Sequence, residues 1–334
     1  MMENNEDKRN VIELAEPPVT TYPSVANILS LLWDRSEGVL PWLCDHFIQI
    51  IVRPNHMNTY GDFYDHADLD NYFRIIYGIP GLGWMRANSE CARFDVFTDY
   101  IEHEIDNGYC LEACLDRYYL SFTKNYEKEH FIHSTFIYGY DKGRKEVYIA
   151  DFWSMGKYEK KVARYDEINL SMNNDYLINL FKRHESKYEL NKELMKKSFM
   201  DYYCSQDSFC KYEFSNQPYN KGVIFGLEYY DYMNNNLKRN EYPDIRLYHL
   251  IYDHKILMRN RLDYLKKLNE YDYDVLQDLS ERNEQMITEA LELRNCSIRY
   301  CFDYSERIYE KILEKTCKLK EMDKSFVKDI LEIL

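Results

Sequence analysis

The sequence predicts an α+β protein, in which an N-terminal half built around an antiparallel sheet is followed by an all-helical C-terminal half. Nine of the eleven glycines and six of the eight prolines precede residue 160, and neither residue occurs after Pro243. The final stretch is rich in Leu, Glu, Lys and Tyr, which is typical of long helices joined by short turns. In the N-terminal half the apolar period changes from helical to alternating near residue 109, which indicates strands.

Apolar residues recur at helical spacing in the C-terminal half. Pro243 and Asp244 supply a start signal for the first of these helices. The apolar positions are Ile245, Leu247, Leu250, Ile251, Leu257 and Met258, then Ile308, Ile312, Leu313 and Leu319, continued by Phe326, Ile330 and Leu331. The composition shift predicts a boundary near residue 170, with domains at 1–170 and 171–334.

Three helices are expected in the N-terminal half. Residues 24–34 and 41–52 have helical patterns, and Pro41 stands near the first turn of the second, where proline is tolerated. A third helix, over 94–104, is followed by Asn107 and Gly108, which form a good C-terminal cap. The stretch 54–92 is rich in Gly, Asn, Asp and His, so we expect loops with short helices there.

Two segments predict strands. Residues 109–116 alternate, with Tyr109, Leu111, Ala113 and Leu115 on one face. Residues 130–153 read as a hairpin, with turn residues from Asp141 to Arg144 between two β-branched and aromatic arms. This hairpin is the strongest prediction that the sequence allows.

The hairpin brings an imidazole and a carboxylate together. His133 on the first arm and Asp151 at the end of the second can lie within hydrogen-bond reach, as a base and the carboxylate that orients it. A nucleophile for this pair is expected at a helix N-terminus, where the helix dipole lowers a thiol pKa. Cys44 lies in the first turn of the helix expected over 41–52, and is the candidate.

These residues resemble a known family. The order of a cysteine on a helix, a strand and the hairpin looks like the papain-like C39-type peptidase fold, and is similar to the N-terminal domain of butirosin biosynthesis protein H. The matching residues are Cys110–Asp116, Tyr118–Leu120, His133, Gly139–Asp141 and Tyr148–Asp151. The match covers roughly residues 40–155.

The resemblance implies thiol-dependent acyl chemistry in a bacterial secondary-metabolite or nonribosomal-peptide pathway. Cys44 would attack a thioester or amide, His133 would act as base and then acid, and Asp151 would orient His133. An acyl-carrier or peptidyl-carrier protein would be a partner, with a peptide or small molecule as substrate. C39-type proteins carry a glutamine upstream of the cysteine, whereas here Gln49 follows Cys44. A catalytically inactive, papain-like accessory or binding protein of such a pathway is therefore the alternative.

Other polar residues have weaker functional readings. His130 competes with His133 as the base, but a solvated edge residue is the preferred interpretation. Cys110 and Cys114 share a strand face with Glu112 and Asp116, which is a minor candidate for a metal site. A further candidate rim of polar residues comprises His46, His56 and His66 with Asp62, Asp65, Asp68 and Asp70. A polar surface loop is the preferred explanation of that rim, and we expect no metal and no cofactor.

Charge and composition exclude several classes. The net charge of −14 argues against binding to nucleic acid or to anionic lipid, because both depend on basic side chains. The N-terminus has no apolar signal segment and no stretch is apolar enough to span a bilayer, so we expect a cytoplasmic protein. The nine cysteines form no CxxC pair, which argues against a disulfide framework or structural zinc.

Overall fold

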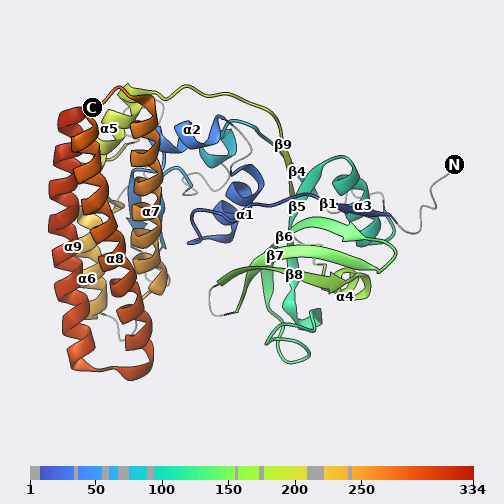
Figure 1. The fold of residues 1–334 in the computed structure, drawn as a ribbon. Helices are drawn as coiled ribbons and strands as arrows, with labels where there is room; N and C mark the ends of the chain where they lie inside the picture. The colour runs from blue at the N-terminus through green and yellow to red at the C-terminus, as the bar shows by residue number, and fades with distance from the viewer. Residues whose placement is uncertain are drawn as a thin grey trace. The chain divides into compact units, whose positions relative to one another are not determined.

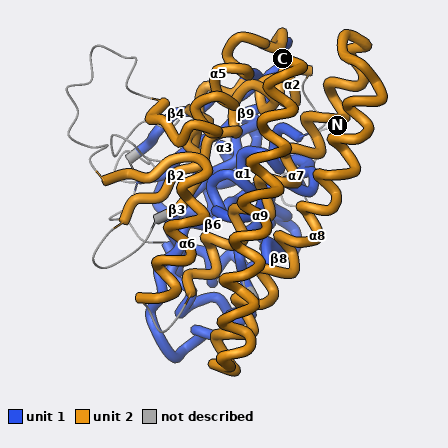
Figure 2. Tube along the Cα trace, turned by 90° about the vertical axis from the view of Figure 1, so that its left-hand side faces the viewer, with its two compact units in different colours: residues 1–36, 80–187 blue, residues 37–79, 188–334 orange. Residues whose placement is uncertain are grey.

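The computed structural model forms two compact units (Figures 1 and 2). Unit 1 comprises residues 1–36 and 80–187, and unit 2 comprises residues 37–79 and 188–334. The structure describes residues 8–33, 37–54, 60–66, 75–88, 94–154, 157–172, 177–208, 222–239 and 243–334. The mixed composition of strands and helices, with a helical C-terminal region, confirms the predicted α+β class.

Unit 1 contains an antiparallel sheet with the strand order β4-β9-β5-β6-β7-β8, in which β1 also pairs with β6. The strands are β1 (Arg9–Val11), β4 (Leu82–Asn88), β5 (Tyr109–Asp116), β6 (Ile132–Asp141), β7 (Glu146–Ser154), β8 (Lys157–Arg164) and β9 (Leu177–Arg183). The predicted strand at 109–116 is β5, with the same bounds. It lies between β9 and β6, and most of its residues are buried on both faces.

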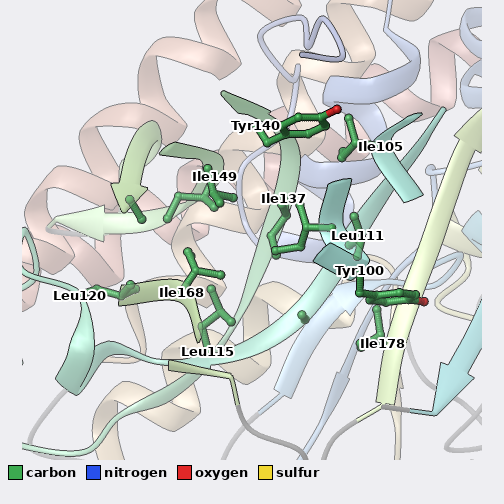
Figure 3. Packing of buried hydrophobic residues seen from close by; sticks show 14 of the residues in the cluster. Tyr100, Ile105, Leu111, Leu115, Leu120, Ile137, Tyr140, Ile149, Ile168 and Ile178 are labelled. Atoms are coloured by element: carbon green, nitrogen blue, oxygen red, sulfur yellow. The ribbon is translucent and has the colours of Figure 1, made fainter. Parts of the chain in front are cut away.

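Helices cover the two faces of this sheet. On one face, Ile105 of α3 (Phe97–Asp106) and Ile168 of α4 (Tyr165–Ser171) pack against Leu111 and Ile137 of the strands (Figure 3). Successive side chains of a strand point to opposite faces, so Glu112 lies on the other face from Leu111. There Glu112 accepts a hydrogen bond from Asn27 of α1 (Pro23–Leu32). The predicted helices at 24–34 and 94–104 are confirmed as α1 and α3.

The predicted hairpin is β6 and β7. The two strands pair antiparallel from Asp141–Glu146 to Phe136–Ala150, with a register shift between Ile137 and Gly139. A Cβ atom on Gly139 would lie only 2.8 Å from Val11 Cα, because β1 pairs against this part of β6. Glycine is therefore required where the N-terminal strand joins the sheet.

Unit 2 is mainly helical. Its helices are α2 (Val39–Asp45), α5 (Lys192–Tyr203), α6 (Glu228–Arg239), α7 (Ile245–Leu268), α8 (Tyr273–Asp303) and α9 (Glu306–Ile333). The long helices α7, α8 and α9 pack side by side in sequence order, as the orange and red ribbons of Figure 1 show. The start signal at Asp244 is confirmed, because its side chain accepts a hydrogen bond from the Arg246 N–H at the beginning of α7.

A buried polar cluster ties these helices together. Lys255 of α7 and Asp323 of α9 are both fully buried and lie 2.6 Å apart. Tyr202 and Tyr230 donate hydrogen bonds to the same Asp323 carboxylate. Burial opposes the charge of Asp323, but Lys255 and these donors outweigh it and lower the carboxyl pKa. Buried charges need such compensation, which fixes the register of four helices.

Unit 2 also contains strands that the sequence did not predict. The helix expected over 41–52 is wrong beyond Asp45, because Ile50–Arg53 form β2, which pairs with β3 (Tyr60–Phe63) and β10 (Ile224–Phe225). An apolar run of this length fits a buried strand as well as a helix, and β2 is buried between two partners.

The prediction of loops with short helices over 54–92 missed two strands, β3 in unit 2 and β4 in unit 1. It is correct for η2 (Ile75–Gly78), which is a short helix.

The division into units differs from the predicted domains at 1–170 and 171–334. β9, which follows residue 170, pairs with β5 and with β4 in unit 1. Residues 37–79 belong to unit 2, where α2 packs on α5 and α7. β9 and β10 also mean that the region after residue 170 is not entirely helical. The units differ from the predicted domains because strands distant in sequence pair with each other, and the local composition gives no signal for such pairing.

Candidate functional site

The His133 and Asp151 side chains meet in unit 1, as the hairpin predicts. His133 Nδ1 lies 2.8 Å from Asp151 Oδ2. The Asp151 carboxylate is completely buried, whereas the His133 side chain is 30% exposed. The carboxylate also accepts hydrogen bonds from Thr135 Oγ1 and from the backbone N–H of Phe152. The geometry is that of an imidazole whose orientation is fixed by a buried carboxylate.

Arg117 is a third member of this site. It lies at the start of η4 (Arg117–Tyr119), directly after β5, and its side chain is 7% exposed. Its Nη2 donates to Asp151 Oδ2 at 2.7 Å. A buried arginine and a buried carboxylate compensate each other, so Asp151 serves the arginine as well as the histidine.

Aromatic rings surround the charged groups. The Arg117 guanidinium lies over the rings of Phe131 and Trp153, 5.3 and 4.9 Å from their centroids. Phe131 also stacks on His133, with ring centroids 5.7 Å apart and an angle of 15° between the planes. Phe131 itself is 43% exposed. The site is therefore a cluster of three polar side chains, His133, Asp151 and Arg117, with the partly exposed ring of Phe131 beside it.

A second His–Asp pair lies close in sequence to the first. His130 Nδ1 is 2.6 Å from Asp116 Oδ2, and the His130 side chain is 62% exposed. Asp116 also accepts hydrogen bonds from the backbone N–H groups of Tyr118 and Phe131. Burial raises the Asp116 pKa, but these donors and His130 outweigh it and the pKa is lowered. Asp116 thus closes the loop from β5 to β6, and His130 is the solvated edge residue expected.

Cys44 lies in a different place from that expected. It belongs to unit 2, whereas His133 and Asp151 belong to unit 1. α2 begins at Val39 and ends at Asp45, so Cys44 is in the last turn of the helix and not the first. The helix dipole there disfavours a negative charge. The side chain is buried, and burial raises the pKa of the Cys44 thiol to about 12.

Arg261 holds the end of this helix. The guanidinium of this fully buried α7 residue donates hydrogen bonds to the carbonyl oxygens of Leu43, Cys44 and His46. The last carbonyls of a helix have no partner within the helix, and a cation beside them also favours the dipole. Arg261 is therefore a structural cap. The chain turns directly after this helix, at Phe47, which has a positive φ of 48°.

The thiols in the described part of unit 1, Cys110 and Cys114, lie on β5. Burial raises the pKa of Cys110, and burial followed by the charges of Glu112 and Asp151 raises the pKa of Cys114 to about 11. Glu112 accepts a hydrogen bond from Asn27 at one carboxylate oxygen and from Asn179 at the other. Across the described residues, no group of three or more His, Cys, Asp or Glu side chains is arranged to hold a metal.

The polar rim proposed around residues 46–70 is in part a set of buried pairs. His66 Nδ1 lies 2.6 Å from Asp62 Oδ2, and both side chains are buried. Asp65 accepts a hydrogen bond from the backbone N–H of Phe47, and its burial raises the carboxyl pKa. His46 pairs with Asp45 at 2.6 Å. His56, Asp68 and Asp70 lie outside the described residues. The pairs that are described stabilise a turn, and no surface rim is formed by them.

Within unit 1 the structure thus brings His133 and Asp151 together and adds Arg117. The only sequence signal for Arg117 was its position at the end of β5, one residue after Asp116, where a side chain can reach the neighbouring strands. No family model matches the chain, and the comparison with curated proteins finds no match. None of the described helices combines the length and the apolar character that a membrane span requires.

Proposed function

We propose that the protein is a papain-like accessory or binding protein of a bacterial secondary-metabolite or nonribosomal-peptide pathway, and that Cys44 is not a nucleophile. Its ligand would be a peptide or small molecule, delivered free or on a carrier protein. The resemblance of residues 110–151 to the butirosin biosynthesis protein H family supports the pathway context. The buried state of Cys44 supports the non-catalytic reading over thiol-dependent acyl transfer or hydrolysis.

The pKa of Cys44 carries this proposal. Acyl transfer through a cysteine requires the thiolate, because the thiol itself is a poor nucleophile. Burial raises the pKa of Cys44 to about 12, so at pH 7 the thiolate is far rarer there than at an ordinary cysteine. The position of Cys44 at a helix C-terminus acts in the same direction.

The cysteines on β5 offer no substitute. Cys114, the half-buried one, has a pKa of about 11, and two carboxylates contribute to that shift. Cys110 is fully buried. A carboxylate beside a thiol disfavours the thiolate, whereas catalytic cysteines lie in electropositive surroundings. The His133–Asp151 pair is therefore supported as a binding group more strongly than as the base of a cysteine.

Labelling with iodoacetamide at pH 7.5, followed by peptide mass spectrometry, tests the state of Cys44. The exposed Cys204 and Cys317 serve as references within the same folded chain. We expect both references to react before Cys44, and Cys44 to react only in denaturant. Labelling of Cys44 ahead of the references would contradict the proposal.

A second experiment tests acyl transfer directly. The full chain and its Cys44→Ala variant are incubated with an acyl-N-acetylcysteamine thioester, and intact masses are recorded. We expect no acyl adduct on either chain and unchanged binding of a phosphopantetheinylated carrier domain by Cys44→Ala. An adduct that is present in the parent and absent from both Cys44→Ala and His133→Ala would establish thiol catalysis instead.

A further inference from the structure

The hydrogen-bond partners of the His133 ring define its tautomer. Nδ1 lies 2.8 Å from Asp151 Oδ2 and 3.0 Å from the carbonyl oxygen of Ser134. Both of these atoms are acceptors, so an unprotonated Nδ1 would direct its lone pair at two oxygens. Nδ1 therefore carries the hydrogen in the neutral ring.

Arg117 does not alter this assignment. Its Nη2 is 3.2 Å from His133 Nδ1, but it lies closer to Asp151 Oδ2, at 2.7 Å. A guanidinium only donates, and here the carboxylate is the acceptor available to it. Arg117 and His133 thus donate to the same oxygen from two sides, which holds the carboxylate and the ring in one arrangement.

The opposite ring nitrogen is left as an acceptor. When Nδ1 carries the hydrogen, Nε2 of a neutral imidazole presents a lone pair. Within the described residues, the polar contacts of the His133 ring all involve Nδ1, and the side chain is 30% exposed. Phe131 stacks on the ring and is itself partly exposed, so an apolar surface lies beside this acceptor.

We propose that His133 Nε2 binds the O–H, N–H or S–H group of a ligand, and that Phe131 contacts an apolar part of the same ligand. The site would take alcohols, amines or thiols and reject carboxylates and phosphates, whose ionised oxygens carry no hydrogen to donate to the Nε2 lone pair. This inference rests on the proposed function, since it treats His133 as a binding group and not as the base of Cys44.

His130 provides the matched control. Its Nδ1 is also held by a carboxylate, that of Asp116, but its side chain is 62% exposed and its ring stacks on Tyr118. An acceptor that is so open to water gains little from a ligand donor, because each ligand hydrogen bond replaces one to water. We therefore expect selectivity at His133 and little at His130.

Histidine ring ¹⁵N resonances of the full chain at pH 8 test both steps. Long-range ¹⁵N–¹H correlations first report the tautomer, which we expect to be Nδ1–H for His133. Four probes of similar size are then titrated: benzyl alcohol, benzylamine, benzyl methyl ether and benzoate. The alcohol and the amine should shift His133 Nε2 saturably, and the ether should bind several-fold to about tenfold more weakly, which is the value of one hydrogen bond.

Variants locate the effect. His133→Phe keeps an aromatic ring against Phe131 but has no acceptor, so it should bind the alcohol and the ether equally, whereas His130→Phe should retain the preference. The proposal is overturned by an Nε2–H tautomer, by benzoate binding as well as benzyl alcohol, or by no saturable shift with any probe. The tautomer is read on the unmodified chain, so a variant that fails to fold does not remove the test. These readouts do not depend on Cys44, so the inference and the proposed function can fail separately.

Discussion

Removal of the Asp151 carboxylate should destabilise unit 1 strongly. The Asp151 side chain is fully buried and the Arg117 side chain is 7% exposed, with 2.7 Å between the charged atoms. Asp151→Ala leaves the arginine as an uncompensated buried charge, which costs about 3–5 kcal/mol. The attraction between the two charges is worth less than this in net terms, because both lose water on folding. The loss therefore measures the desolvated arginine more than the ion pair.

The assay is urea unfolding at pH 7.5, followed by tryptophan fluorescence, since Trp153 lies over the Arg117 guanidinium. Asp166→Ala is the matched control, because Asp166 pairs with Arg164 while both side chains are about two-thirds exposed. An exposed pair contributes about 0–1 kcal/mol. The double variant Asp151→Ala with Arg117→Met should recover part of the loss, because no buried charge remains. A difference of less than about 1 kcal/mol between Asp151→Ala and Asp166→Ala would refute the buried pair.

Three further outcomes are expected. Burial, followed by the charge of Lys255, lowers the pKa of His254 to about 3. Between this pH and about 6.5 the unfolded chain therefore binds more protons than the folded chain. The free energy of unfolding falls on acidification through this window. Urea unfolding at pH 7 and pH 5 should show about 2 kcal/mol of acid sensitivity that His254→Gln lacks; an equal fall in the variant would contradict this. Gly139→Ala should cost about 1–3 kcal/mol by the same assay, because its Cβ meets the β1 backbone, whereas Gly78→Ala, with open space around it, should be near neutral. Cys44→Ala should lower the free energy of unfolding by about 1 kcal/mol, since it removes a buried sulfur; a stabilised variant would argue against good packing at this position.

Several elements could be predicted from sequence because their signals are local. The strand 109–116 alternates along its whole length, the hairpin has turn residues between two β-rich arms, and Asp244 caps the helix that follows it. Strand and helix periods, turns and caps depend on residues within a few positions of each other. The pairing of His133 with Asp151 belongs to this group, because the two residues lie on the two strands of one hairpin, β6 and β7.

The remaining features depend on contacts between distant parts of the chain. The short apolar segment 50–53 became a strand because β3 and β10 pair with it, whereas its own pattern fitted the helix that was predicted. Cys44 lost the environment of a nucleophile because α2 ends at Asp45 and the side chain is buried. Arg261, more than two hundred residues away in the sequence, caps the end of this helix. Arg117, in η4, joined the site because Asp151, on β7, is its buried partner.

By itself, the sequence determined the α+β class, the hairpin and the imidazole–carboxylate pair, through interactions between neighbouring residues. The tertiary structure decided which charged side chains are buried and how far the pKa of each thiol is raised, because burial is a property of the whole packed unit. For that reason the base and its carboxylate could be named from the sequence, while the state of Cys44 and the part of Arg117 could not.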